Sequence, residues 1–210
     1  RFVHADTLGM TVDGVAQRPD GTDQALVQLF FKTNEAGEEL FRLEFLQPEE
    51  MAGEVFVTNP EGTFLWNPDL VTPLKVSTRQ EVFGDASVAE TAGIRFANGD
   101  YAVAGRQDVE GGLEVTLEAT DPGVAFQTAA VVVDPETLQP QRMRLFALGG
   151  EPINDVAFEA YADLDGDAYA ARQQIASRFV EGNQTLLTIT NIEARPLDDA
   201  LFDHTQLGGE

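Results

Sequence analysis

The side chains that most often carry out catalysis are few in this 210-residue chain, and they lie far apart. It has two histidines, His4 and His204, and no cysteine. Neither histidine has a partner at the helical spacing that holds zinc, and no Gly-x-Ser-x-Gly motif is present to position a serine nucleophile. We therefore expect no catalytic residue and no enzymatic activity.

Carboxylates are numerous, but their spacing matches neither a metal site nor an acid–base pair. The segment Asp163-Leu164-Asp165-Gly166-Asp167 alternates oxygen ligands that could attract calcium. It has no glutamate at the end of the loop and its glycine follows the second aspartate, so a glycine-containing hairpin turn is the simpler interpretation. We interpret Glu49-Glu50 and Asp198-Asp199 as solvated surface pairs. The sequence predicts no metal site and no cofactor.

The charge balance limits the partners. The chain carries 36 acidic and 13 basic side chains, for a net charge of −23. Because the acids are spread along the whole chain, they would repel a polyphosphate backbone, and we exclude nucleic acid. Anionic lipid headgroups are disfavoured for the same reason. A solubilising surface is the simplest interpretation, and a basic partner is the alternative.

The apolar content predicts one well-packed domain that spans residues 1–210. Apolar residues make up 43% of the chain, and 14 of them are phenylalanine, which is enough to build a single core. No apolar run approaches the roughly 20 residues of a membrane-spanning helix. The first ten residues lack the basic start and apolar centre of a signal peptide, so we expect that a signal peptide or lipid anchor has been removed. We expect a monomer.

Apolar and polar residues alternate along short segments, as is typical of antiparallel sheet. Every odd position of residues 24–32 is apolar, and residues 41–45 repeat the pattern with Arg42 and Glu44 on the opposite face. We expect the two segments to form a hairpin closed by residues 34–39. The apolar face of the two segments comprises Ala25, Val27, Leu29, Phe31, Phe41, Leu43 and Phe45.

The same pattern predicts an all-β antiparallel protein of about ten or eleven strands in sequential order, as one curved sheet or an incomplete barrel. Helix is expected at residues 85–91, with Asp85 as the cap and Gly93 as the end, and as one short turn at residues 198–202. Further strands are predicted at residues 54–58, 63–66, 101–107, 113–119, 125–134, 141–148, 154–163, 170–180 and 184–194.

In order, these segments resemble the LolA/LolB-like family of bacterial outer-membrane lipoprotein-sorting proteins, from about residue 24 to 207. The likeness rests on their order along the chain. The residues that carry it are Phe41-Arg42-Leu43-Glu44-Phe45-Leu46-Gln47-Pro48, Gly53-Glu54-Val55-Phe56-Val57, Phe64-Leu65-Trp66-Asn67-Pro68, Val82-Phe83-Gly84-Asp85, Asp100-Tyr101-Ala102-Val103, Asn191-Ile192 and Asp199-Ala200-Leu201-Phe202.

The resemblance implies a strongly curved half-barrel whose open mouth is covered by helices and whose apolar interior holds acyl chains. It also implies a basic residue in the first hairpin that is linked to ligand release, and Lys32 is the residue in that region here.

Large apolar residues are more numerous than one face of each strand requires. Phe30 precedes Phe31, and Phe64, Leu65 and Trp66 follow one another, so both faces of these strands carry large apolar side chains. Either loops and helices cover the second face, or one face lines a cavity. With the family resemblance we favour an apolar, acyl-chain cavity. Its expected lining comprises Val27, Leu29, Phe31, Phe41, Leu43, Phe45, Val57 and Trp66.

The segment around residues 82–91 is expected to form a lid on this cavity. A helix this short must gain its stability by laying apolar side chains on something else, and Phe83 and Val88 are the candidates. Gly84 would be the hinge. The sequence thus predicts a periplasmic or cell-envelope carrier or chaperone for lipid or lipoprotein acyl chains. The alternative is an envelope sensor or interaction domain of the same fold that binds a protein partner.

Overall fold

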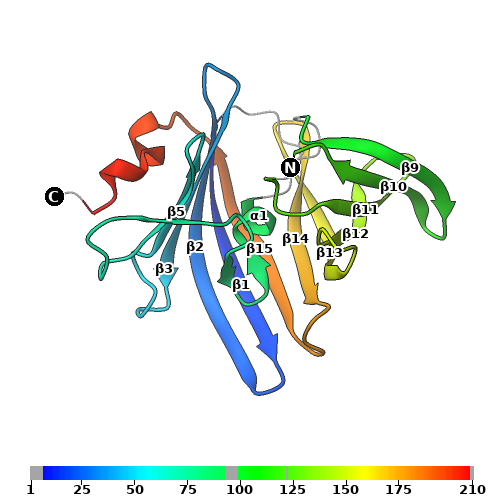
Figure 1. The fold of residues 1–210 in the computed structure, drawn as a ribbon, viewed down its shortest axis with the longest axis horizontal. Coiled ribbons are helices and arrows are strands. Elements are labelled where there is room, and N and C mark those ends of the chain that lie inside the picture. Colours follow the sequence, from blue (N-terminus) through cyan, green and yellow to red (C-terminus); the bar gives the residue numbers. More distant parts are fainter. Residues whose placement is uncertain (1–6, 93–98, 122, 209–210) are drawn as a thin grey trace.

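The computed structural model describes residues 7–92, 99–121 and 123–208, and most of these lie in one antiparallel sheet of 13 strands (Figure 1). The all-β class and the curved open sheet are confirmed, with more strands than the alternation predicted. The strands of the sheet are β1 (Thr7–Arg18), β2 (Gly21–Thr33), β3 (Glu39–Gln47), β4 (Val55–Asn59), β5 (Gly62–Trp66), β6 (Leu74–Val76), β9 (Tyr101–Val109), β10 (Gly112–Ala119), β11 (Thr128–Val133), β12 (Pro140–Phe146), β13 (Pro152–Leu164), β14 (Asp167–Ser177) and β15 (Gln184–Ala194).

The sheet consists of two meanders that meet at β1. Strands β1 to β6 run outward in one direction and β15 to β9 in the other, because β1 pairs with both β2 and β15 (Figure 1). Strand β1 was not predicted, although Leu8, Met10 and Val12 alternate along it. Its pattern weakens at Gly14 and Ala16, where small residues replace large ones. The sequence pattern therefore concealed the strand at which the two meanders meet.

The open sheet is strongly curved (Figure 1), and its concave face carries one large apolar cluster. The cluster includes Leu29 and Phe45 from one meander and Leu117 and Met143 from the other. Residues of the strands between them also belong to it, so the cluster runs continuously across both meanders. Several bulges, such as that between Thr11 and Val12, add twist to the pairing.

A small unit lies on the concave face. It consists of the two-stranded sheet β7 (Glu81–Phe83) and β8 (Ala86–Ser87), followed by helix α1 (Val88–Ala92), and we call residues 81–92 the covering unit (Figure 1). The predicted helix is shorter than expected and begins later. Asp85 is not its cap: the Ser87 Oγ accepts from the Glu90 N–H, and the Glu90 carboxylate accepts from the Ser87 N–H, which is a capping box. Gly93 lies outside the described residues.

The convex face carries a second, smaller cluster beneath the C-terminal segment. This segment contains two 3₁₀ turns, η1 (Asp199–Phe202) and η2 (His204–Gln206), and the first confirms the short turn expected at residues 198–202. Asp198 caps η1. Phe30, Val57 and Phe202 belong to this cluster. Among the helices of the described residues, none is long and apolar enough to cross a bilayer.

Candidate functional site

Six of the eight predicted lining residues lie together on the concave face. They form three directly opposed pairs between β2 and β3, because Val27 is opposite Phe45, Leu29 opposite Leu43 and Phe31 opposite Phe41. All six are less than 9% exposed, and the rings of Phe31 and Phe41 are 5.1 Å apart. Opposed apolar pairs of this kind each add to sheet stability. The alternation therefore identified a real and continuous apolar surface.

The structure separates Val57 and Trp66 from that surface. Val57 is opposite Arg42 on β3, and Phe56 is opposite Leu43, so Phe56 takes the concave position and Val57 the convex one. Trp66 likewise packs against the convex cluster, while Leu65 packs against the concave one. The connection between β3 and β4 determines which residues of β4 face inward, and a shift by one residue reverses both faces.

Phe83 and Val88 lie on the concave face, where the lid hypothesis placed them. Val88 is 2% exposed within the concave cluster, and Phe83 packs against it. The ring of Phe83 covers Gly14 of β1 so closely that a Cβ added to Gly14 would lie 2.9 Å from its Cδ1. Because Gly14 has no side chain, it leaves the space that the aromatic ring requires. Whether a ligand displaces the two side chains stays a prediction.

Gly84, the expected hinge, has a positive φ, but it is also pressed against the sheet. Its φ is 59°, and an added Cβ would lie 2.8 Å from the Cβ of Ala16 and overlap the Thr185 Oγ1. The next residue, Asp85, donates its backbone N–H to that oxygen over 2.8 Å. A hinge motion at Gly84 would have to break this contact.

A buried carboxylate that sequence reasoning missed, Glu90, anchors the covering unit to the sheet. Glu90 is 4% exposed. Its Oε2 accepts from the N–H and Oγ of Ser87, and its Oε1 accepts from the Asn154 Nδ2 of β13 over 2.7 Å. Asn154 also donates to the carbonyl of Asp85. The Ser87-x-x-Glu90 spacing was the visible signal, whereas Asn154 is distant in sequence.

Burial raises the pKa of Glu90 above its ordinary value, and the negative charge of Asp85 adds to the effect. Hydrogen bonds from Asn154 and Ser87 act in the opposite direction but do not cancel the loss of hydration. An ionised carboxylate in this position therefore carries an energetic cost that water would relieve if the unit lifted from the sheet.

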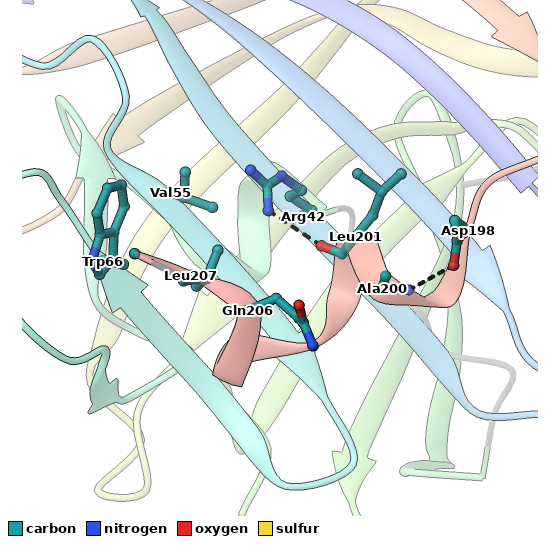
Figure 2. A pocket seen from close by; sticks show the side chains of 9 residues that line it. Arg42, Val55, Trp66, Asp198, Ala200, Leu201, Gln206 and Leu207 are labelled. Atoms are coloured by element: carbon teal, nitrogen blue, oxygen red, sulfur yellow. Dashed lines mark hydrogen bonds between the residues drawn. The ribbon is translucent and has the colours of Figure 1, made fainter. Parts of the chain in front are cut away.

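The convex side has a pocket of about 330 Å³ between the sheet and the C-terminal segment (Figure 2). The Arg42 Nη1 donates to the carbonyl of Leu201 across it, and Asp198 accepts from the Ala200 N–H. The residues that line it are Arg42, Val55, Trp66, Asp198, Ala200, Leu201, Gln206, Leu207 and Gly208. Figure 2 shows Trp66 and Leu207 at one end and Asp198 at the other.

The basic residue of the first hairpin does not face the concave side. The Lys32 Nζ donates to the carbonyl of Leu197 over 2.7 Å and lies 2.6 Å from the Asp199 carboxylate. Both partners belong to the C-terminal segment on the convex face. The ligand-release role that the resemblance implied for a basic residue here is therefore not supported for Lys32, which fastens that segment.

The histidine and the aspartate-rich turn that the structure describes make contacts that stabilise the fold. The ring of His204 stacks on Phe64 at 3.7 Å, and His4 lies outside the described residues. The Asp163 carboxylate accepts from the Gly166 N–H in the turn between β13 and β14, which confirms the predicted hairpin turn. Within residues 7–92, 99–121 and 123–208, no group of three or more histidine or acidic side chains is placed to hold a metal ion.

Comparison with known proteins gives a family and a fold. A family model described as an uncharacterized protein matches residues 37–208. A search of curated proteins finds no match. Among solved structures, a LolA superfamily protein from Nitrosomonas europaea has a TM-score of 0.83 at 18% identity, covering 96% of this chain and 91% of the other.

Two further structures agree. A DUF1329 family protein from Desulfovibrio piger has a TM-score of 0.78 at 18% identity, covering 97% of this chain and 92% of the other. A domain from Vibrio parahaemolyticus, named an outer-membrane lipoprotein-sorting protein domain, has a TM-score of 0.79 at 15% identity with the same two coverages. The shared feature is the fold.

Proposed function

Because the chain belongs to the family of uncharacterized proteins whose model matches residues 37–208 and has the fold of LolA superfamily proteins, we propose that it is a non-enzymatic carrier or chaperone for acyl chains. It acts in the periplasm or at the cell envelope, and the chain 1–210 works as one binding domain. Its ligands are lipids or the acyl chains of lipoproteins, as the name of the Vibrio parahaemolyticus domain suggests for that protein.

The observation that carries this proposal is what covers the concave face. Six large apolar side chains of β2 and β3 line that face, and the covering unit, residues 81–92, packs on the same apolar cluster. A five-residue helix such as α1 has little stability of its own. The apolar surface is thus built into a rigid sheet, whereas its cover depends on contacts that can be exchanged for a ligand.

Polar anchors hold the cover in a defined place. The backbone of Asp85 is tied to Thr185 on β15, and Glu90 is tied to Asn154 on β13. Removal of the cover would expose Val88 and Phe83, and an acyl chain would replace them on the sheet. Burial of a methylene contributes about 0.8 kcal/mol, so about ten buried carbons would offset the loss of these contacts.

The first test is chemical identification of a bound ligand. The protein is purified without detergent, extracted with organic solvent, and the extract is analysed by mass spectrometry. We expect a fatty acid, phospholipid or lipoprotein acyl chain in an amount comparable to that of the protein. An extract without any lipid, together with no uptake of a fluorescent fatty acid by the purified protein, would contradict the proposal.

The second test concerns the cover. Replacement of Phe83 and Val88 by Ser should leave the strand signal in circular dichroism intact and speed the uptake of a fluorescent acyl probe, because the cover then packs less tightly. Val132→Ser is the matched control, since Val132 is 2% exposed on β11 but belongs to neither apolar cluster. If both proteins lose stability alike and neither takes up the probe faster, the covering unit is part of a closed core.

A second candidate function, the protein-binding sensor, is favoured by the open edge of the sheet. Strand β9 is the last strand in the order, and most of its side chains are exposed along nine residues. An edge of this length can pair with an extended segment of another protein. Two results together would favour the sensor over the carrier. The organic extract would contain no lipid, and the protein would bind a peptide whose binding Val103→Pro abolishes.

A further inference from the structure

Exposed apolar side chains gather at one end of the strands. Seven of the eight large apolar residues that are most exposed in the described part of the chain lie at or near the end where β1 stops and β2 begins. Only Leu138, in the turn between β11 and β12, lies at the opposite end. Scattered exposed leucines are ordinary on protein surfaces, but so uneven a distribution indicates a surface with a role.

Two of these residues stand on a well-ordered hairpin tip. Phe179 and Val180 follow β14 and are 69% and 48% exposed. The Ser177 Oγ accepts from both of their backbone N–H groups, and the carbonyl of Val180 accepts from the Asn183 N–H. Since the backbone bonds are made within the turn, the tip holds its shape while the two side chains point into solvent.

A third apolar residue is presented by the neighbouring hairpin. Leu148 is 82% exposed in the turn between β12 and β13. That turn lies at the same end as Phe179, because β13 and β14 are antiparallel partners with Asn154 opposite Ser177, and the Arg178 N–H donates to the carbonyl of Ile153. Leu148, Phe179 and Val180 together are the hairpin-tip surface.

The tip of the β1–β2 hairpin adjoins this surface. A Cβ added to Gly182 would lie 3.5 Å from the Cγ of Pro19, so the β14–β15 and β1–β2 turns are in contact. Figure 1 shows these two hairpins reaching beyond the rest of the sheet at its lower end. Phe179 and Val180 are therefore at a protruding part of the molecule that a flat surface could reach.

We propose that the hairpin-tip surface inserts into zwitterionic phospholipid bilayers. The three side chains project from two separate turns. Even a fully buried aromatic residue contributes only about 150–250 Å², so three such side chains fall short of the roughly 800 Å² per partner of a stable protein interface. A fluid lipid surface needs no matching pockets and can accommodate each side chain separately.

The charges at this end determine which lipids are suitable. Arg178 is paired with Asp155 at 3.3 Å, and Asp20, Glu151 and Glu181 lie in the adjoining turns. With a net charge of −23, the protein is repelled by anionic headgroups, whereas zwitterionic headgroups carry no net charge to oppose it. Insertion driven by apolar side chains should therefore be weakened, not strengthened, by anionic lipid.

The absence of cysteine from the sequence makes a direct test simple. Single Leu148→Cys, Phe179→Cys and Leu138→Cys variants are labelled with an environment-sensitive fluorophore and mixed with vesicles of phosphatidylcholine alone or with added phosphatidylglycerol. We expect fluorescence to rise and shift to the blue at positions 148 and 179 with phosphatidylcholine vesicles and to stay unchanged at position 138. Because Leu138 is 64% exposed at the opposite end, it is the matched control.

Vesicle flotation of unlabelled protein gives the second readout. Leu148→Ser combined with Phe179→Ser should lower partitioning into phosphatidylcholine vesicles about tenfold or more, because each change removes an apolar side chain from the interface. Leu138→Ser should leave it unchanged. Neither readout depends on acyl-chain binding, so the outcome is separate from that of the proposed function.

Three results would overturn the proposal. The first is equal fluorescence changes at all three labelled positions, which would indicate nonspecific adsorption. The second is stronger binding to vesicles that contain phosphatidylglycerol, which would indicate electrostatic attraction through a different surface. The third is no flotation of the wild-type protein, which would show that the hairpin-tip surface does not bind a bilayer.

Discussion

Replacement of Gly84 by Ala tests whether this residue is a free hinge or a close-packed anchor. The structure gives Gly84 a φ of 59°, and an added Cβ would lie 2.8 Å from the Cβ of Ala16 and would overlap the Thr185 Oγ1. Real Cβ atoms do not approach other atoms so closely, so the covering unit or the sheet has to move. The hydrogen bond from the Asp85 N–H to Thr185 would be strained or lost with that movement.

The magnitude follows from two separate costs. Alanine at a positive φ costs about 1 kcal/mol relative to glycine. Overpacking at a buried contact adds typically 1–3 kcal/mol. We therefore expect Gly84→Ala to lower the free energy of unfolding by about 2–4 kcal/mol in total.

Gly37→Ala is the matched control. Gly37 also has a positive φ, of 80°, but nothing lies within 4 Å of the position that its Cβ would take. This variant should lose only the backbone cost of about 1 kcal/mol. Urea denaturation followed by circular dichroism gives the free energy of unfolding of the wild type and both variants. The difference between the two variants is the cost of the steric overlap at Gly84.

Equal losses for the two variants would refute the reasoning. In that case the covering unit is not pressed against Ala16 and Thr185 in solution, and Gly84 is free to act as a hinge. The acyl-probe assay adds a second expectation. If the overlap lifts the unit from the sheet, Gly84→Ala should take up the probe faster than the wild type, and Gly37→Ala should not.

Two further predictions concern single polar side chains. Because burial raises the pKa of Glu90, the folded protein keeps this proton to a higher pH than the unfolded chain. The wild type should therefore lose stability relative to Glu90→Gln as pH rises from about 4.5 through the raised pKa, and parallel curves in urea denaturation against pH would show that the carboxyl is solvated. Lys32→Met should loosen the C-terminal segment, detected as faster hydrogen exchange of residues 197–207, without altering acyl-probe uptake. A large change in uptake would restore the ligand-release role to Lys32.

Local patterns in the sequence were sufficient for the strands and turns whose signal is contained in one segment. The alternation along β2 and β3 identified their common apolar face, and β15 was predicted at its observed bounds, Gln184–Ala194. The turn at Gly166 was also predicted correctly. Such features are readable because side chains alternate between faces with a period of two and because glycine accepts backbone conformations that other residues avoid.

Strand β1 was missed because its packing partner is distant in sequence. Gly14 and Ala16 look like interruptions in the chain, yet they are small because Phe83 and Gly84 lie on them. Propensity alone cannot show that a small residue makes room for a large one about 70 positions away. The same limitation hid Asn154, which becomes a partner of Glu90 only when β13 is placed next to the covering unit.

The sequence by itself determined which residues alternate and where the chain turns. Only the tertiary structure decided which face each strand presents. Val57 and Trp66 were assigned to the concave lining and lie on the convex side, because the pairing of Arg42 with Val57 sets the register of β4 against β3. A shift of one residue exchanges the two faces of a strand, and that shift depends on the connecting turn and on burial across the whole sheet, not on the strand's own residues.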